Sequence, residues 1–370
     1  MGNNTKSGGS AQAKSGWKFR HVLVTVLLVI VVIVFLGAVA FLALQISGKN
    51  SLYGKADAQE MRTALSEMTV SLGGTLEEEE EEEDWQVGDF RYKGVHYRYN
   101  EDIMTFLFLG IDDMDEVKVV ADGVEGGQSD AIFLLVMNPH NKQITVIAVN
   151  RNTMTDIDVY DKLGNYLGRA KAQLALQHGY GDAAGVSCER TKETVSNLFR
   201  GLPIHGYCAI NMGAIPLLND AVGGIELQAL ETMDFKDFSI EEGETIHLKG
   251  MDAYYYLHNR DVNTFNSAGG RLARQQQYLM LYAEAAIQAI KADITFPVTL
   301  YNTLSKYMVT DVSLNEVSYL ATQMLDYQFN MENMHSLRGS TVMGEKFEEF
   351  YVDETALYEL IVEVFYEEVK

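Results

Sequence analysis

The sequence predicts an α/β fold: a three-layer α/β/α domain with a central mixed sheet, preceded by one transmembrane helix. Three observations lead to this prediction. Apolar runs of strand length lie between residues 105 and 149, helical patterns follow and interleave with further short strands, and one long apolar run lies near the N-terminus. Hydrophobic residues make up 47% of the 370 residues and prolines number only 4, which is enough apolar material for a core.

The long apolar run extends from Val22 to Leu44 and contains only apolar residues, Thr and Gly. As a helix it would be about 35 Å long, enough to cross a hydrocarbon layer of roughly 30 Å. Four basic residues and no acidic one precede it, which predicts a cytoplasmic N-terminus, a single pass through the cell membrane and an extracellular C-terminal domain. A cleaved signal peptide is the alternative, but the run is longer than the usual apolar region of about 7–15 residues.

The chain divides into four predicted parts. Residues 1–21 form a cytoplasmic tail, 22–44 the transmembrane helix, 45–89 a stalk with an acidic linker, and 90–370 the extracellular domain. The stalk combines a helix-prone stretch over 55–71 with Gly73, Gly74 and the acidic run Glu77 to Asp84. Such a block of like charges is usually solvated, so we expect no cation site in it.

The folded part begins with short apolar runs. Residues 105–109, 131–137 and 144–149 are predicted strands, and the last two should form an antiparallel hairpin around a turn at 138–142. Helices are expected over 170–178, 189–199 and 212–221, with strands at 207–210 and 225–227. A longer helix over 270–291 carries Arg271 and Arg274 away from its apolar face, and helix-like segments and loops after Val312 complete the fold.

Charge and cysteine content exclude two classes of site. The chain has 52 acidic against 29 basic residues and a net charge of −23, which argues against a nucleic-acid partner. Only Cys188 and Cys208 are present, so a four-cysteine zinc site is impossible. One disulfide and two buried free thiols both remain compatible with the sequence.

Acidic and basic residues at strand and helix ends could serve phosphate chemistry. Asp112 follows one strand and Asp130 precedes the next, so the two carboxylates could meet and hold Mg²⁺. The simpler interpretation is that each merely supports a turn. Arg151 ends a buried strand, and three more arginines follow at 260, 271 and 274. Arginine binds phosphate oxygens bidentately, although an arginine of this kind taken alone is more often a surface ion-pair partner.

The order of these motifs resembles the LytR-CpsA-Psr family. The matching stretches are Phe106-Leu-Phe-Leu-Gly-Ile-Asp112, Ser129-Asp130, the strand leading into Arg151, Asn219-Asp-Ala-Val-Gly-Gly-Ile225, Leu248-Lys-Gly250 with Ala253, and Arg271-Leu-Ala-Arg-Gln275. They cover about residues 100 to 295, and the tail to 370 resembles the family's usual C-terminal part. No single stretch is specific, but six in this order are.

The resemblance implies a magnesium-dependent glycopolymer–peptidoglycan phosphotransferase. Such an enzyme moves a glycopolymer from an undecaprenyl-pyrophosphate carrier to peptidoglycan, with the lipid in an apolar groove of the domain. The expected partners are therefore a polyprenyl-pyrophosphate-linked glycopolymer, peptidoglycan and the membrane, and the expected cofactor is Mg²⁺. The resemblance assigns residues as follows: Asp112 and Asp130 to the metal; Arg151, His258, Arg260, Arg271 and Arg274 to the pyrophosphate; and Arg151, Asn152 and Arg260 to catalysis.

Three departures from the family's pattern leave a second function open. The chain has Asn150-Arg151-Asn152 where Pro-Arg-Asp is usual, His258-Asn-Arg260 where Arg-x-Arg is usual, and Ala268 where an Asp is usual. The alternative is a catalytically weakened polyprenyl-phosphate or wall-polymer binding protein with a scaffolding or regulatory role. Asp156, Asp158 and Asp261 are candidates to replace the acid missing at Asn152. Transcriptional regulation is disfavoured because the segment before the membrane helix is too short for a DNA-binding fold.

Overall fold

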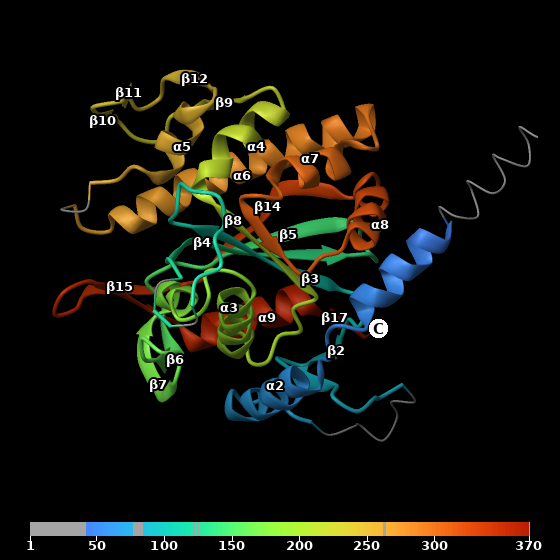
Figure 1. Ribbon diagram of the computed structural model, residues 1–370. Coiled ribbons are helices and arrows are strands. Elements are labelled where there is room, and N and C mark those ends of the chain that lie inside the picture. The colour runs from blue at the N-terminus through green and yellow to red at the C-terminus, as the bar shows by residue number, and fades with distance from the viewer. Residues whose placement is uncertain (1–41, 77–83, 122, 125, 262–263, 370) are drawn as a thin grey trace, which may run out of the picture.

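The structure is a computed structural model, and it describes residues 42–76, 84–121, 123–124, 126–261 and 264–369 (Figure 1). Residues 42–53 form a helix that includes the last three residues of the predicted membrane span. The rest of that span and most of the acidic run lie outside the described residues. Within the described ranges, no helix combines the length and the apolar character needed to cross a membrane.

A mixed sheet of six strands lies at the centre, as the sequence predicts. In spatial order the strands are β13 (Met308–Thr310), β8 (Gly206–Asn211), β3 (Met104–Ile111), β4 (Ser129–Asn138), β5 (Gln143–Ala148) and β14 (Gln328–Ser336). The pairs β8–β3 and β5–β14 are parallel. The pairs β13–β8, β3–β4 and β4–β5 are antiparallel.

Both faces of this sheet are buried, which explains why its central strands have few polar residues (Figure 1). Side chains alternate between the faces, so Leu107 and Phe106 of β3 belong to different cores. On the face of Leu107 pack α2 (Gln59–Ser71), α3 (Gly185–Leu198) and α9 (Glu354–Phe365). The face of Phe106 is covered by α6 (Ser267–Ala292), α7 (Phe296–Leu304) and α8 (Leu314–Met324).

A smaller third core lies on the outer side of α6 (Figure 1). Tyr278 of α6 belongs to it together with Tyr256 and Leu257 of α5. The elements around this core are α4 (Ile215–Ala221), β9 (Ile225–Gln228), β10 (Met233–Phe235), β11 (Phe238–Ile240), β12 (Thr245–Leu248) and α5 (Met251–His258). Because this layer covers α6, Arg274 is only 1% exposed, and Arg271, which pairs with Asp130, is 3% exposed, although the sequence predicts both away from the helix's apolar face.

Two predicted segments differ from the structure. The predicted helix over 170–178 is instead the end of β7 (Tyr166–Gln173), which pairs with β6 (Met154–Tyr160), and the 3₁₀ helix η1 (Leu174–Gly179). The helical pattern in the sequence came from Leu174 and Ala175, which are buried in η1. The strand β7 is largely exposed, so its sequence lacks the alternation of apolar and polar residues that indicates a half-buried strand. The predicted stalk contains α2, whose Met61 and Leu65 are fully buried in the core, so this part of 45–89 belongs to the domain.

The C-terminal region contains strands that the sequence does not reveal. Besides β14, it forms the hairpin β15 (Gly339–Met343) and β16 (Glu348–Val352) and the strand β17 (Tyr366–Glu368). β17 joins β1 (Phe90–Tyr92) and β2 (Val95–Tyr99) in a separate sheet. The hairpin β15–β16 is largely exposed, so it lacks the apolar alternation by which half-buried strands are recognised.

The two cysteines do not form a disulfide in this structure. Cys188 is buried in α3, and its Sγ lies 3.7 Å from Nε2 of His178. Burial raises the pKa of the Cys188 thiol and raises the pKa of Cys208 to about 12. Of the two possibilities that the sequence left open, the structure therefore has two free thiols.

Candidate functional site

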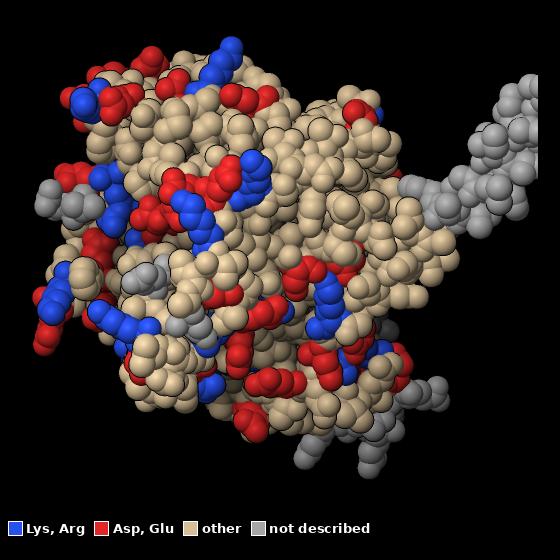
Figure 2. Space-filling model, viewed as in Figure 1, with Lys and Arg blue, Asp and Glu red and all other residues tan. Residues whose placement is uncertain are grey.

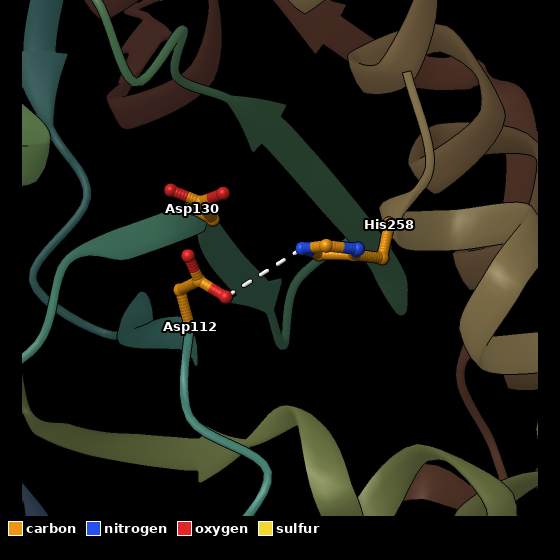
Figure 3. A group of neighbouring side chains, drawn as sticks. All are labelled: Asp112, Asp130 and His258. Carbon is orange, nitrogen blue, oxygen red and sulfur yellow. Dashed lines mark ion pairs between the residues drawn. The ribbon is translucent and has the colours of Figure 1, made fainter. Parts of the chain in front are cut away.

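Asp112, Asp130 and His258 form a cluster at one end of the central sheet. Asp112 directly follows β3 and Asp130 lies near the start of β4, and these strands are antiparallel neighbours, so the two carboxylates meet as predicted. His258 reaches them from the end of α5. Figure 3 shows the three side chains pointing toward one another, and one ligand atom from each lies within 4.8 Å of the others.

A close approach of the strands places these carboxylates side by side. Gly110 of β3 lies opposite Ala131 of β4, and a Cβ atom on Gly110 would lie only 3.0 Å from that of Ala131. The register shifts directly after Gly110, and the backbone N–H of Asp112 donates to the carbonyl of Gln128 at 3.0 Å. The glycine therefore permits the backbone arrangement that turns Asp112 toward Asp130.

Asp130 is the centre of a buried arginine pair. Its Oδ1 lies 2.7 Å from Nη1 of Arg151, and its Oδ2 lies 2.8 Å from Nη1 of Arg271. The Asp130 side chain is only 3% exposed. One buried carboxylate thus faces two guanidinium groups, so these three side chains carry one more positive than negative charge.

Arg151, Arg260 and Arg271 share one region of the protein. Nη2 of Arg271 is buried and has no hydrogen-bond partner among the described residues, so it can donate to a ligand. Arg260 donates from Nη1 to Oγ of Ser267 at 2.9 Å. Burial, followed by the repulsion from Arg271, lowers the pKa of Arg260. The negatively charged oxygens of a bound phosphate would offset the repulsion between these partly buried guanidinium groups.

Arg274 has a different position from the one that the sequence predicts. Its Nε lies 2.8 Å from Oε1 of Glu231, and its Nη atoms donate to the backbone carbonyls of Tyr256 and Asn259. These carbonyls flank His258 at the end of α5. Arg274 therefore holds the chain segment that carries His258 and Arg260.

His258 contacts the cluster through Asp112. Its Nε2 lies 3.5 Å from Oδ1 of Asp112 (Figure 3). The ring of His258 also stacks on Tyr254, with a centroid distance of 4.9 Å. The hydrogen bond from His258 lowers the pKa of Asp112, and the charges of Arg151 and Arg271 lower it further. Asp112 is consequently ionised at neutral pH, as a metal ligand must be.

Asn152 lines a pocket of about 470 Å³ together with Arg151 and Arg260. Its Oδ1 accepts from Nε2 of Gln173 at 3.2 Å, and its Nδ2 donates to Oε2 of Glu348 at 3.5 Å. Glu348 was not among the candidate acids from the sequence, because it lies far along the chain in an exposed hairpin with no motif. The candidates Asp156 and Asp158 instead line a different pocket, beside β6 and β7.

An apolar cavity of about 240 Å³ lies between the sheet and the helices of its α6 face. Phe108 of β3 and Leu135 of β4 form part of its floor. Tyr301 of α7 and Leu320 and Met324 of α8 lie opposite. The surface over α7 and α8 carries few charged side chains, in contrast to most of the view in Figure 2.

Comparison with known proteins decides the family. The model of the LytR_cpsA_psr family matches residues 62–363, which is most of the chain. The chain belongs to the LytR_cpsA_psr family. The match includes most of α2, from residue 62 onward, in agreement with the position of that helix in the core.

Individual members of the family support the same assignment. The chain is 30% identical over 264 residues to the polyisoprenyl-teichoic acid–peptidoglycan teichoic acid transferase TagU of Enterococcus faecalis, covering 70% of this chain and 77% of TagU. Its fold is similar to that of Bacillus subtilis TagV, with a TM-score of 0.53, 21% identity and coverage of 70% and 94%. It is also similar to TagT bound to LI-WTA, with a TM-score of 0.52, 18% identity and coverage of 71% and 89%.

Proposed function

We propose that this protein transfers a glycopolymer from a polyprenyl-pyrophosphate carrier to peptidoglycan, as a magnesium-dependent phosphotransferase. The observation that carries the proposal is the combination of a cationic cluster and an apolar cavity on one face of one sheet. Phe106 and Phe108 of β3 line the cavity, and Asp112 directly follows the last residue of β3. Side chains two residues apart share a face, so an amphipathic ligand could contact both places.

Helix α6 connects the two places. Arg271 lies in its first turns beside Asp130, and Ile290 near its C-terminus lines the cavity. The rise between these residues corresponds to about 28 Å of helix. A polyprenyl pyrophosphate has a charged head and a long apolar tail, so this arrangement suits its two ends, with the pyrophosphate at the arginines.

Asp112 and Asp130 would hold the magnesium ion. Mg²⁺ prefers oxygen ligands, often one or two carboxylates together with water and phosphate oxygens, and two aspartates provide such a set. His258 is a poor ligand for this ion and fits better as a hydrogen-bond donor to Asp112. When bound, the ion would neutralise charge on the pyrophosphate oxygens.

Arg151, Arg260 and Arg271 would complete the anion site. Phosphoryl transfer is catalysed mainly by positioning and by stabilising charge on the phosphate oxygens. Nη2 of Arg271 is available for this purpose. Because the side chains of Arg151 and Arg271 are largely buried, their hydrogen bonds to phosphate would be stronger than in bulk water.

The relatives support this substrate class. TagU of Enterococcus faecalis bears the name of a polyisoprenyl-teichoic acid–peptidoglycan teichoic acid transferase, and the TagT structure has LI-WTA bound. We infer a wall polymer as donor and peptidoglycan as acceptor for this chain as well. The apolar run over 22–44 would anchor it in the cell membrane, with residues 1–21 in the cytoplasm and the α/β/α domain outside.

The test is a transfer assay with the full chain in detergent micelles, Mg²⁺, a labelled polyprenyl-pyrophosphate-linked oligosaccharide and a peptidoglycan fragment. We expect label to move to peptidoglycan, and the substitution Asp112→Ala to abolish the transfer. Asp113→Ala is the matched control because Asp113 is adjacent but absent from the cluster. Equal loss in both variants, or transfer that persists in Asp112→Ala, would refute the proposed metal site.

A binding protein without turnover is the second candidate, and Asn152 and His258 favour it. In the family's usual pattern, an aspartate stands at the position of Asn152 and an arginine at the position of His258. In the same assay, such a protein would bind the lipid without moving sugar, while the double variant Asn152→Asp, His258→Arg would recover transfer.

A further inference from the structure

The hairpin β15–β16 brings a carboxylate to the pocket from outside the recognised motifs. Glu348 is the first residue of β16, and it lines the pocket together with Arg151, Asn152 and Arg260. Its Oε2 accepts from Nδ2 of Asn152 at 3.5 Å. The two residues are 196 positions apart in sequence, so only the tertiary fold joins them.

The position of Glu348 is fixed by backbone hydrogen bonds. The N–H of Phe350 donates to the carbonyl of Asn152 at 2.9 Å, which docks β16 on the segment that follows Arg151. The carbonyl of Glu348 accepts from Nε2 of Gln173 at 2.6 Å. Its Oε1 accepts from the backbone N–H of Asn266, just before α6. The backbone of β16 is thus fixed at two points, and the carboxylate accepts at Oε1 from Asn266 and at Oε2 from Asn152, so it is pre-organised for a role in the pocket.

We propose that Glu348 is the general base of the transfer reaction and replaces the acid that is missing at Asn152. This inference rests on the function proposed above. The acceptor hydroxyl would attack the phosphorus nearer the sugar, forming a new P–O bond as the bond to the bridging oxygen breaks. Polyprenyl phosphate leaves, and the proton of the hydroxyl passes to the carboxylate of Glu348. Arg151 and Arg260 would stabilise the phosphate charge on the same pocket wall.

The surroundings of Glu348 suit this role. It is partly exposed, so an acceptor can reach it from solvent. The exposed aromatic side chains of Phe265 and Phe347 line the same pocket and offer apolar surfaces to a sugar ring. The basic residues Arg151, Arg260 and Lys346 line the same pocket as Glu348.

The experiment compares Glu348→Gln with Glu349→Gln in the full chain in detergent micelles. Glu349 is the neighbour in the same strand, and its Oε2 accepts instead from the hydroxyl of Tyr351. We expect Glu348→Gln to reduce kcat by roughly 100-fold to 1,000-fold, the usual contribution of a general base, with lipid affinity within twofold. Glu349→Gln should stay within twofold in both quantities, and both variants should unfold at the wild-type temperature.

Two further readouts separate catalysis from a structural role. The acidic limb of the wild-type pH–rate profile should disappear in Glu348→Gln, because its amide does not titrate in this range. The kcat of the double variant Asn152→Asp, Glu348→Gln should be at least tenfold higher than that of Glu348→Gln, because the double variant again has a carboxylate at this place in the pocket.

The outcomes distinguish this inference from the proposed function. If the wild type transfers polymer and Glu348→Gln retains a third of its kcat, Glu348 is not the base while the function stands. If the wild type transfers nothing, the proposed function fails and the role of Glu348 fails with it.

Discussion

The substitution Arg271→Lys tests the anion site most directly. Arg271 is 4% exposed in its side chain, and its guanidinium pairs with Asp130 through Nη1 at 2.8 Å while Nη2 has no partner among the described residues. Lysine keeps the charge but has one nitrogen on a flexible chain. The lysine ammonium can still pair with Asp130, but it cannot present a second hydrogen-bond donor in the fixed position of Nη2.

The expected loss follows from that missing donor. A hydrogen bond to a charged group contributes about 1.5–3 kcal/mol. Since each 1.4 kcal/mol is about tenfold in affinity, Arg271→Lys should weaken pyrophosphate binding by roughly 10-fold to 150-fold. The free energy of unfolding should change by less than about 1 kcal/mol, because Asp130 remains paired with a cation.

Isothermal titration calorimetry with inorganic pyrophosphate and Mg²⁺ measures the affinity, and urea unfolding measures the stability. Arg169→Lys is the control, since Arg169 is an exposed partner of Asp158 away from the cluster. An affinity within threefold of the wild type would refute the role of Nη2. An equal loss in Arg169→Lys would show that the effect does not depend on the position of Arg271 in the site.

Three further predictions concern other buried groups. Arg274→Met should destabilise the protein by about 1–3 kcal/mol in urea, because Arg274 is 1% exposed and its loss leaves the backbone carbonyls of Tyr256 and Asn259 without their donor; unchanged stability would contradict this. Burial lowers the pKa of His205 to about 4 in the folded protein, so on acidification the unfolded protein takes up a proton at this residue before the folded protein does. The free energy of unfolding should therefore fall by about 3 kcal/mol as pH drops from 6.5 to 4. In His205→Asn, which still accepts from the N–H of Thr105, thermal unfolding across that range should show a smaller loss. The thiol of Cys188, whose pKa burial raises, should react with a thiol reagent only after denaturation; rapid labelling of the native protein would contradict its burial.

Much of the central sheet could be predicted from local sequence. The runs at 105–109, 131–137 and 144–149 are apolar on both faces because helices cover both sides of the sheet. The positions of Asp112 and Asp130 at adjacent strand ends also predicted their meeting. Where burial arises from distant elements, prediction failed: β7 and the hairpin β15–β16 carry little apolar periodicity, and α2 was assigned to a stalk.

The sequence by itself determined which chemical groups the site contains and which family the motifs resemble. Residue identity and spacing are enough for that, since strand ends place carboxylates and arginines at one edge of a sheet. Only the tertiary structure decided how those groups are used. Arg271 and Arg274 are three residues apart on one helix, yet the first faces Asp130 and the second is enclosed by α5 and Glu231. Glu348 meets Asn152 across the whole domain, because packing is set by contacts that no local pattern encodes.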